Sequence, residues 1–372
     1  MLEVADILRR YGDGYLLKFS DKMLYSQHRA FADIINCRTQ LMGGHLFQCD
    51  QCGHQRYCYH SCRNRSCPKC HKNDTAAWLD QRQQELLNVK YYHVVFTLPG
   101  PLRQIVRLHQ KRLYGILMKA AAQALIKLAR DPHYVGGLIG VMCILHTWSR
   151  TLVYHTHVHC LVPAGGISSD RQQWLPARKN YLVPVEALSI LFRGIFTDMV
   201  RRQLPQIRLP ASLWRKNWVV YCKPTIQGPD KVLNYLARYV HRVAITNSRI
   251  ISIDDGQVTF RYKPTKSPRS KTMTLHAHEF IRRFLQHVLP KGVHKVRYYG
   301  LWSPANRKDL YRVKSLLADD NDADAPESQP QQINTTETQR TSTPEQKCPR
   351  CKTGTLLWLA RIPRQGRAPP PS

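Results

Sequence analysis

The segment that decides the fold is residues 154–162, which read Tyr154-His155-Thr156-His157-Val158-His159-Cys160-Leu161-Val162. Alternate residues of a β-strand point to the same face of its sheet. The spacing therefore predicts a strand that carries three imidazoles on one face. Residues 138–148 form a second β-rich run, and only the tetrapeptide 149–152 connects the two, so we expect them to form a hairpin.

The histidines of this strand are candidate metal ligands. Neutral imidazoles at positions i and i+2 can chelate one divalent ion and leave positions open for water or phosphate, and His157 and His159 are the predicted pair. The Cα atoms of His155 and His159 would lie about 13 Å apart on a regular strand, so we expect His155 to orient a ligand or to replace one. The alternative is an exposed histidine-rich strand or an ordinary zinc site, because an H-x-H motif alone is weak.

A helix predicted over residues 229–245 supplies the second chemical signal. At 100° per residue, Tyr235 and Tyr239 lie one turn apart at the edge of its apolar arc, next to Arg238 and Arg242. A tyrosine oxygen can form a covalent intermediate with a DNA phosphodiester, and arginine can neutralise the developing charge. The alternative is an aromatic packing pair with arginine stacked over it. The histidine strand favours the catalytic interpretation.

Six of the twelve cysteines lie between residues 49 and 70. Two C-x-x-C knuckles at that spacing can bind one Zn²⁺ through four thiolates, and the predicted ligands are Cys49, Cys52, Cys67 and Cys70. Three residues between the knuckles are alternative ligands or could hold a second ion: Cys58, His60 and Cys62. The alternative is a buried or redox-active cysteine pair. Three basic residues of this segment are expected to contact a phosphate backbone: Arg63, Arg65 and Lys69.

The composition restricts the partners of the protein. The 372 residues include 56 Lys+Arg against 25 Asp+Glu, a net charge of +31, so a polyanion is the expected partner. A hydrophobic fraction of 43% is ordinary for a folded protein and excludes a disordered basic chain. The apolar runs are too short to span a bilayer, and residues 1–6 do not resemble a secretory signal. We expect a cytoplasmic protein with metal-bound cysteines and no membrane partner.

Three motifs in order carry a family resemblance: residues 96–99 (Phe-Thr-Leu-Pro), residues 157–163 (His-Val-His-Cys-Leu-Val-Pro) and residues 235–239 (Tyr-Leu-Ala-Arg-Tyr). Together they resemble the two-tyrosine HUH transposases of the insertion sequence ninety-one family, and residues 62–70 resemble the zinc-binding region of that family. This resemblance covers approximately residues 30–305.

The resemblance implies a rolling-circle-like DNA transposase. Its catalytic domain would have an antiparallel sheet flanked by helices. His157 and His159 would hold Mg²⁺ or Mn²⁺. Tyr235 and Tyr239 would attack single-stranded DNA at the ends of a mobile element and form 5′-phosphotyrosine intermediates, with no nucleotide cofactor. Such a protein would act at the bacterial nucleoid. The motif does not reveal a third metal ligand.

The expected fold class is α+β, with an HUH-like antiparallel sheet preceded by a small zinc-binding module. We predict an N-terminal helical segment (1–45), a zinc-binding and DNA-binding module (46–72), a catalytic domain (73–305), an acidic, polar and disordered linker (306–347), and a C-terminal tail (348–372). The tail carries Cys348 and Cys351, half a zinc knuckle with no Cys or His after it, so an independent zinc site there is doubtful.

Two other functions fit parts of the sequence. A plasmid replication initiator or relaxase of the HUH type would share the chemistry but act on other DNA. A zinc-dependent DNA-binding protein without catalysis would bury both tyrosines away from the histidines. The sequence does not give the oligomeric state.

Overall fold

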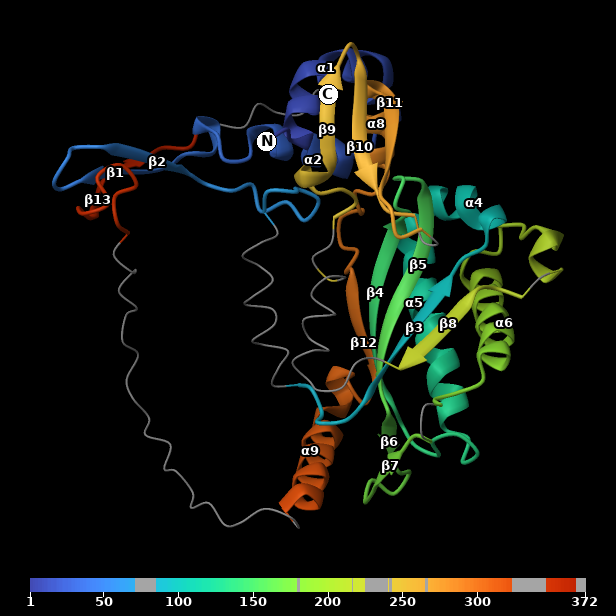
Figure 1. Cartoon of the computed structure of the whole chain (residues 1–372). Helices are drawn as coiled ribbons and strands as arrows, with labels where there is room; N and C mark the ends of the chain where they lie inside the picture. The colour runs from blue at the N-terminus through green and yellow to red at the C-terminus, as the bar shows by residue number, and fades with distance from the viewer. Residues whose placement is uncertain are drawn as a thin grey trace.

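The computed structural model describes residues 1–70, 85–178, 181–215, 217–224, 240, 243–264, 267–322 and 346–365, with residues 319–322 described as backbone only. A five-stranded antiparallel sheet forms its centre, in the order β12-β4-β5-β3-β8 (Figure 1). The strands are β3 (Tyr91–Thr97), β4 (Gly140–Trp148), β5 (Tyr154–Pro163), β8 (Val220–Pro224) and β12 (Val296–Gly300). β4 and β5 pair directly, which confirms the predicted hairpin.

Helices cover one face of this sheet. They are α4 (Arg103–Leu108), α5 (Gln110–Ala129) and α6 (Val185–Gln203), and Figure 1 shows them on one side of the strands. The even-numbered residues of β5 point toward them: Val158 and Cys160 are fully buried in this core. The odd-numbered residues, the three histidines among them, therefore lie on the opposite face.

A second core joins segments far apart in the sequence. Helices α1 (Val4–Phe19) and α2 (Tyr25–Asn36) pack with α8 (Ala277–Leu285) and with the three-stranded sheet of β9 (Ile250–Asp254), β10 (Gln257–Tyr262) and β11 (Lys271–His276). Asp255 and Gly256 connect β9 and β10 with positive φ angles of 46° and 69°, as a tight hairpin turn requires. The predicted segment 1–45 thus has no core of its own, because its apolar faces need residues 250–288.

The third sheet lies at the side of this N-terminal region and pairs strands from the N-terminal and C-terminal parts of the chain. β1 (Gly44–Cys49) is its central strand, paired with β2 (Gln55–Tyr59) on one edge and β13 (Leu356–Ile362) on the other. Figure 1 shows the red β13 beside the blue β1 and β2. The C-terminal tail is therefore part of the zinc-binding region rather than a separate extension. β6 (Gly165–Ile167) and β7 (Trp174–Pro176) form a small two-stranded sheet, which lies below the central sheet in Figure 1.

The predicted linker 306–347 was wrong in its first part, because residues 307–322 form helix α9 (Arg307–Asp322). Leu310 and Val313 are buried and Leu317 partly so, and this spacing makes an apolar stripe on one helix face. The stripe packs against Leu301 and Trp302. Three of the acidic residues that suggested a linker, Asp319, Asp320 and Asp322, belong to the end of this helix.

A buried histidine makes the stability of the fold dependent on pH. His287 is held between Thr147, whose Oγ1 lies 3.2 Å from Nδ1, and the Leu152 carbonyl, 3.1 Å from Nε2. Burial, with smaller effects of Arg107 and Arg282, lowers its pKa to about 3. The folded state therefore keeps this ring neutral where the unfolded chain, with a pKa of about 6.5, binds a proton.

We expect the stabilising effect of His287 to be complete above pH 6.5 and to be lost as the pH falls toward 3. Relative to His287→Gln, the free energy of unfolding of the native protein should decline by about 2 kcal/mol between pH 7.5 and pH 5. Urea unfolding of both proteins at the two pH values measures this. If the difference in the free energy of unfolding between the two proteins does not change with pH, the ring of His287 is charged in the folded state or exposed.

Candidate active site

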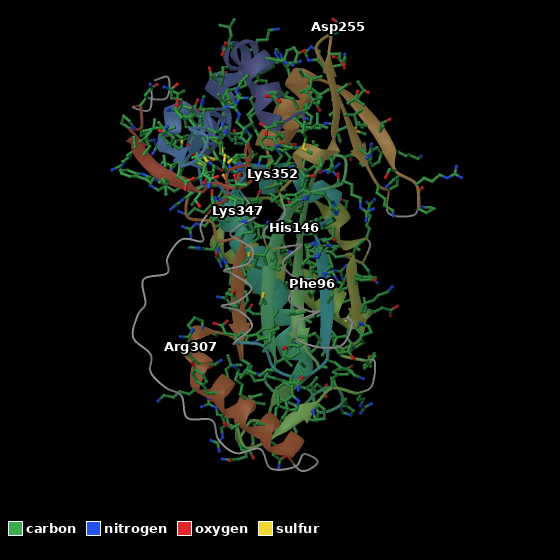
Figure 2. The ribbon with its side chains drawn as sticks, turned by 60° about the vertical axis from the view of Figure 1, so that its left-hand side comes forward. Phe96, His146, Asp255, Arg307, Lys347 and Lys352 are labelled. Atoms are coloured by element: carbon green, nitrogen blue, oxygen red, sulfur yellow. The ribbon has the colours of Figure 1, made fainter. Side chains whose placement is uncertain are left out.

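Three histidines meet on the face of the central sheet opposite α4, α5 and α6. The register pairs His157 of β5 with His146 of β4, and His159 with Ile144, so the two strands direct these imidazoles to the same side. Ring centroids lie 5.4 Å (His146–His157), 4.5 Å (His146–His159) and 4.9 Å (His157–His159) apart. One nitrogen from each ring lies within 4.8 Å of the others, which suits a shared metal ion. Figure 2 labels His146 in the middle of the sheet.

His146 is a candidate metal ligand that the sequence did not predict. It lies in the apolar run of β4, is only 2% exposed, and has no neighbouring histidine in the sequence. The predicted hairpin could have indicated His146, because a register that pairs residue 146 with residue 157 places both side chains on the same face of the sheet. The register itself could not be read from the connection at residues 149–152.

Hydrogen bonds orient two of these rings. His157 Nδ1 lies 2.9 Å from the His155 carbonyl, and since a carbonyl only accepts, Nδ1 carries the hydrogen and the lone pair of the neutral ring lies on Nε2. His159 Nδ1 lies 2.8 Å from Nε2 of His93, a residue of β3, and the two rings are stacked. Burial lowers the pKa of His93 to about 4, so this ring is neutral at pH 7. Such partners hold metal-binding imidazoles in a fixed tautomer and direction.

His155 contributes through its backbone carbonyl. Its ring lies 5.1 Å from that of His157 but is outside the three-histidine cluster, in line with the expected orienting role. Burial and the nearby Arg103 lower its pKa.

A chain of contacts leads from the histidine cluster to the segment that contains the tyrosines. The ring of Trp148 stacks on His146 with centroids 4.6 Å apart. The ammonium of Lys295 lies 5.1 Å from the centroid of Trp148 and donates to the carbonyl of Val240 at 2.9 Å. Val240 is buried in the apolar cluster of the same sheet face, together with Ile144. This contact anchors residue 240 beside the histidines.

The cysteines form two groups. The first contains Cys37 from the end of α2 with Cys62, Cys67 and Cys70; the second contains Cys49 and Cys52 with Cys348 and Cys351. The predicted single site of Cys49, Cys52, Cys67 and Cys70 was therefore wrong. The pairing of β1 with β13 carries the first knuckle toward the C-terminal tail and away from the second. Of the alternative ligands, Cys62 belongs to the first group, whereas Cys58 and His60 belong to neither.

Comparisons with known proteins agree with these features. A model described as "Transposase zinc-binding domain" matches residues 7–98, and one described as "Putative transposase" matches residues 140–309. "Putative transposase y4qJ" of Sinorhizobium fredii is 39% identical over 377 residues, covering 96% of this chain and 94% of that protein. The chain belongs to the IS91 family of transposases. "Transposase for insertion sequence element IS801" of Pseudomonas savastanoi pv. phaseolicola is 28% identical over 287 residues, covering 72% of this chain and 68% of that protein. No solved structure matches the chain.

The catalytic and DNA-binding predictions on the tyrosine segment lie outside the described residues of the transposase: Tyr235, Tyr239, Arg238 and Arg242. Val240 is described as helical, whereas Val243–Ile245 are not, so the predicted helix does not extend to Ile245. Ala244 and Ile245 instead join the core of the N-terminal helices.

The three basic residues predicted in the zinc-binding region have different surroundings. Arg65 donates to the main-chain carbonyls of Leu289 and Val293, so it ties the cysteine loop to the segment that follows α8. Lys69 forms an ion pair with Glu3. Arg63 is exposed, and its positive φ of 52° forms the turn after Cys62. The DNA contacts expected of these three residues stay predictions.

Among the described residues of the transposase, no helix is both long enough and apolar enough to cross a membrane.

Proposed function

We propose that the transposase cuts and rejoins single-stranded DNA through a 5′-phosphotyrosine intermediate, with Tyr235 and Tyr239 as nucleophiles. The observation that carries this proposal is the cluster of His146, His157 and His159 on the sheet face opposite α4, α5 and α6. Family membership supplies the class of reaction, and the cluster supplies a place for it. A DNA-acting protein of this kind would work at the nucleoid.

The donor set of the cluster fits a divalent ion. Three imidazoles would fill one side of its coordination shell and leave the solvent side for oxygen ligands. Mg²⁺ strongly prefers oxygen, so Mn²⁺ suits three nitrogen ligands better. When bound, such an ion would polarise the scissile phosphate. The protein residues position it: His155 and His93 fix the directions of His157 and His159.

The contact of Lys295 with Val240 supports the location of the nucleophiles. Val240 directly follows Tyr239 in the sequence and is buried on the histidine face of the sheet. We propose that the adjacent Tyr239 serves this site. The phenol would lose its proton, its oxygen would form a bond to phosphorus, and the bond from phosphorus to the 3′ oxygen would break. The freed 3′ oxygen would take up a proton, and its later attack on a phosphotyrosine would rejoin the strand.

A cleft with a basic lining lies on the helix side of the sheet, opposite the face that carries the histidines. Its volume is about 1130 Å³, and its walls come from α5, α6, β12 and the turn before β12. No acidic side chain is among its described lining residues, whereas five basic ones are: Lys111, Arg112, Lys119, His294 and Arg297. Such a surface attracts a phosphate backbone independently of sequence.

We expect Lys111→Gln/Arg112→Gln to weaken binding of a single-stranded oligonucleotide and to reduce the salt dependence of log K by a slope of about 1.4, since each lost phosphate contact removes about 0.7. Fluorescence anisotropy at several salt concentrations measures this. Lys127→Gln/Arg130→Gln, on the same helix but outside the cleft lining, is the matched control. If the two double variants weaken binding equally, DNA binding depends on the net charge of the protein rather than on the cleft.

The decisive experiment mixes the protein with labelled single-stranded DNA from candidate element ends and Mn²⁺. We expect a protein–DNA adduct that survives denaturing electrophoresis and requires the divalent ion. If the protein binds and cleaves an element end in this assay but forms no adduct with it, the nucleophile is not a tyrosine. Formation of the adduct would also argue against a DNA-binding protein without catalysis.

A further inference from the structure

We propose that Cys49, Cys52, Cys348 and Cys351 bind a Zn²⁺ ion of their own, in a zinc ribbon assembled from the two ends of the chain. This ion is separate from the one expected in the Cys37 group. The zinc-binding family model ends at residue 98 and the transposase model at residue 309, so Cys348 and Cys351 lie outside both.

The sulfur positions fit a tetrahedral ion. The sulfurs of Cys49 and Cys351 lie 3.6 Å apart, and those of Cys52 and Cys348 lie 3.7 Å apart. Zn–S bonds of about 2.3 Å place the sulfurs of a regular tetrahedron about 3.8 Å from one another. The distances are too long for disulfides, and all four cysteines are free thiols in the structure.

The two C-x-x-C turns have matching backbone conformations. Gly53 donates its amide to the Cys49 carbonyl at 3.1 Å, and Lys352 donates to the Cys348 carbonyl at 2.9 Å. The residue after the second cysteine is left-handed in both turns, with φ of 65° at Gly53 and 64° at Lys352. The same irregular turn thus occurs twice, which is expected of two halves of one metal site. Figure 2 labels Lys352 on the C-terminal half.

The sulfurs of the C-terminal half also accept backbone hydrogen bonds. The amide of Arg350 donates to Cys348 Sγ at 3.4 Å, and the amide of Gly354 donates to Cys351 Sγ at 3.3 Å. Such bonds favour the thiolate form that zinc requires. A Cβ atom at Gly354 would lie 2.5 Å from Cys49 Sγ, so only glycine allows this close approach.

The ribbon has little else to hold it together. Its buried core consists of Cys49, Cys348 and Leu356, with Phe47 and Cys351 partly buried against them. A core of this size is too small to stabilise a folded unit, and small modules of this kind generally need a metal. We therefore infer that zinc holds β13 onto β1, and so holds the C-terminal tail on the N-terminal region.

The zinc content of the full-length protein tests the site. We expect two Zn²⁺ per chain in the native protein and one in Cys348→Ser/Cys351→Ser. Cys58→Ser, on the neighbouring strand but in neither group, should keep both ions. An unchanged zinc content in the double variant would overturn the proposal.

A second measurement does not depend on removing a cysteine. A protease site inserted between residues 330 and 340 allows the full-length, zinc-loaded protein to be cut before the ribbon. We expect the C-terminal fragment to remain bound during gel filtration and to separate after chelation of the metal. The same fragment should separate without chelator in Cys348→Ser/Cys351→Ser. Separation from the zinc-loaded native protein, or retention in the double variant, would show that zinc does not hold the tail.

Discussion

The double variant Tyr235→Phe/Tyr239→Phe should form no covalent adduct with element-end DNA, while it binds that DNA as the native protein does. Removal of the nucleophile from an enzyme that works through a covalent intermediate costs about 10⁶-fold in rate. A phenylalanine ring preserves the packing and deletes only the oxygen. Denaturing electrophoresis of labelled DNA measures the adduct, and anisotropy measures the binding.

Tyr221 provides the matched control. It lies on β8 opposite Val95 of β3, and Val95 lies opposite His159, so its ring projects from the same face of the sheet as the histidines. It is 44% exposed. Tyr221→Phe should leave adduct formation unchanged. If instead the double variant still forms the adduct and Tyr221→Phe does not, the nucleophile is Tyr221. The two single variants, Tyr235→Phe and Tyr239→Phe, would show whether the tyrosines divide the work.

The second large effect concerns His146. We expect His146→Phe to lower the metal-dependent cleavage rate by more than about 100-fold, because loss of a residue that merely supports a ligand already costs 10–100-fold. Phenylalanine keeps the stacking on Trp148 and removes both nitrogens. Binding of Mn²⁺ should weaken in parallel, as measured by the electron spin resonance signal of the free ion.

His155→Phe is the control for this variant. His155 lies on the neighbouring strand β5 and on the same face of the sheet, but its ring is outside the cluster, and its carbonyl, which orients His157, is retained. We expect it to keep most of the Mn²⁺ affinity. If His146→Phe keeps the Mn²⁺ affinity of the native protein, the metal is bound by the β5 histidines without His146. Thermal unfolding of both variants separates a loss of ligand from a loss of fold.

The fold could be predicted from local signals to a large extent. Alternation along residues 154–162 predicted β5 and the face of its histidines, and the short connection at residues 149–152 predicted the β4–β5 hairpin. These patterns depend on neighbours in the sequence, and period and turn chemistry are local properties. The α9 helix was missed because its acidic end outweighed the apolar spacing of Leu310 and Val313.

The sequence by itself determined the kinds of chemistry in this transposase: a histidine strand, a tyrosine pair, thiolate knuckles and a strongly basic chain. Only the tertiary structure decided which residues share a site. His146 joins His157 and His159 through the register of β4 with β5, and Cys348 and Cys351 join Cys49 and Cys52 because β13 pairs with β1. Both groupings depend on strand pairing between segments, and for the cysteines those segments are about 300 residues apart. Spacing within a motif fixes which ligands are available, whereas long-range hydrogen bonding and burial fix their partners.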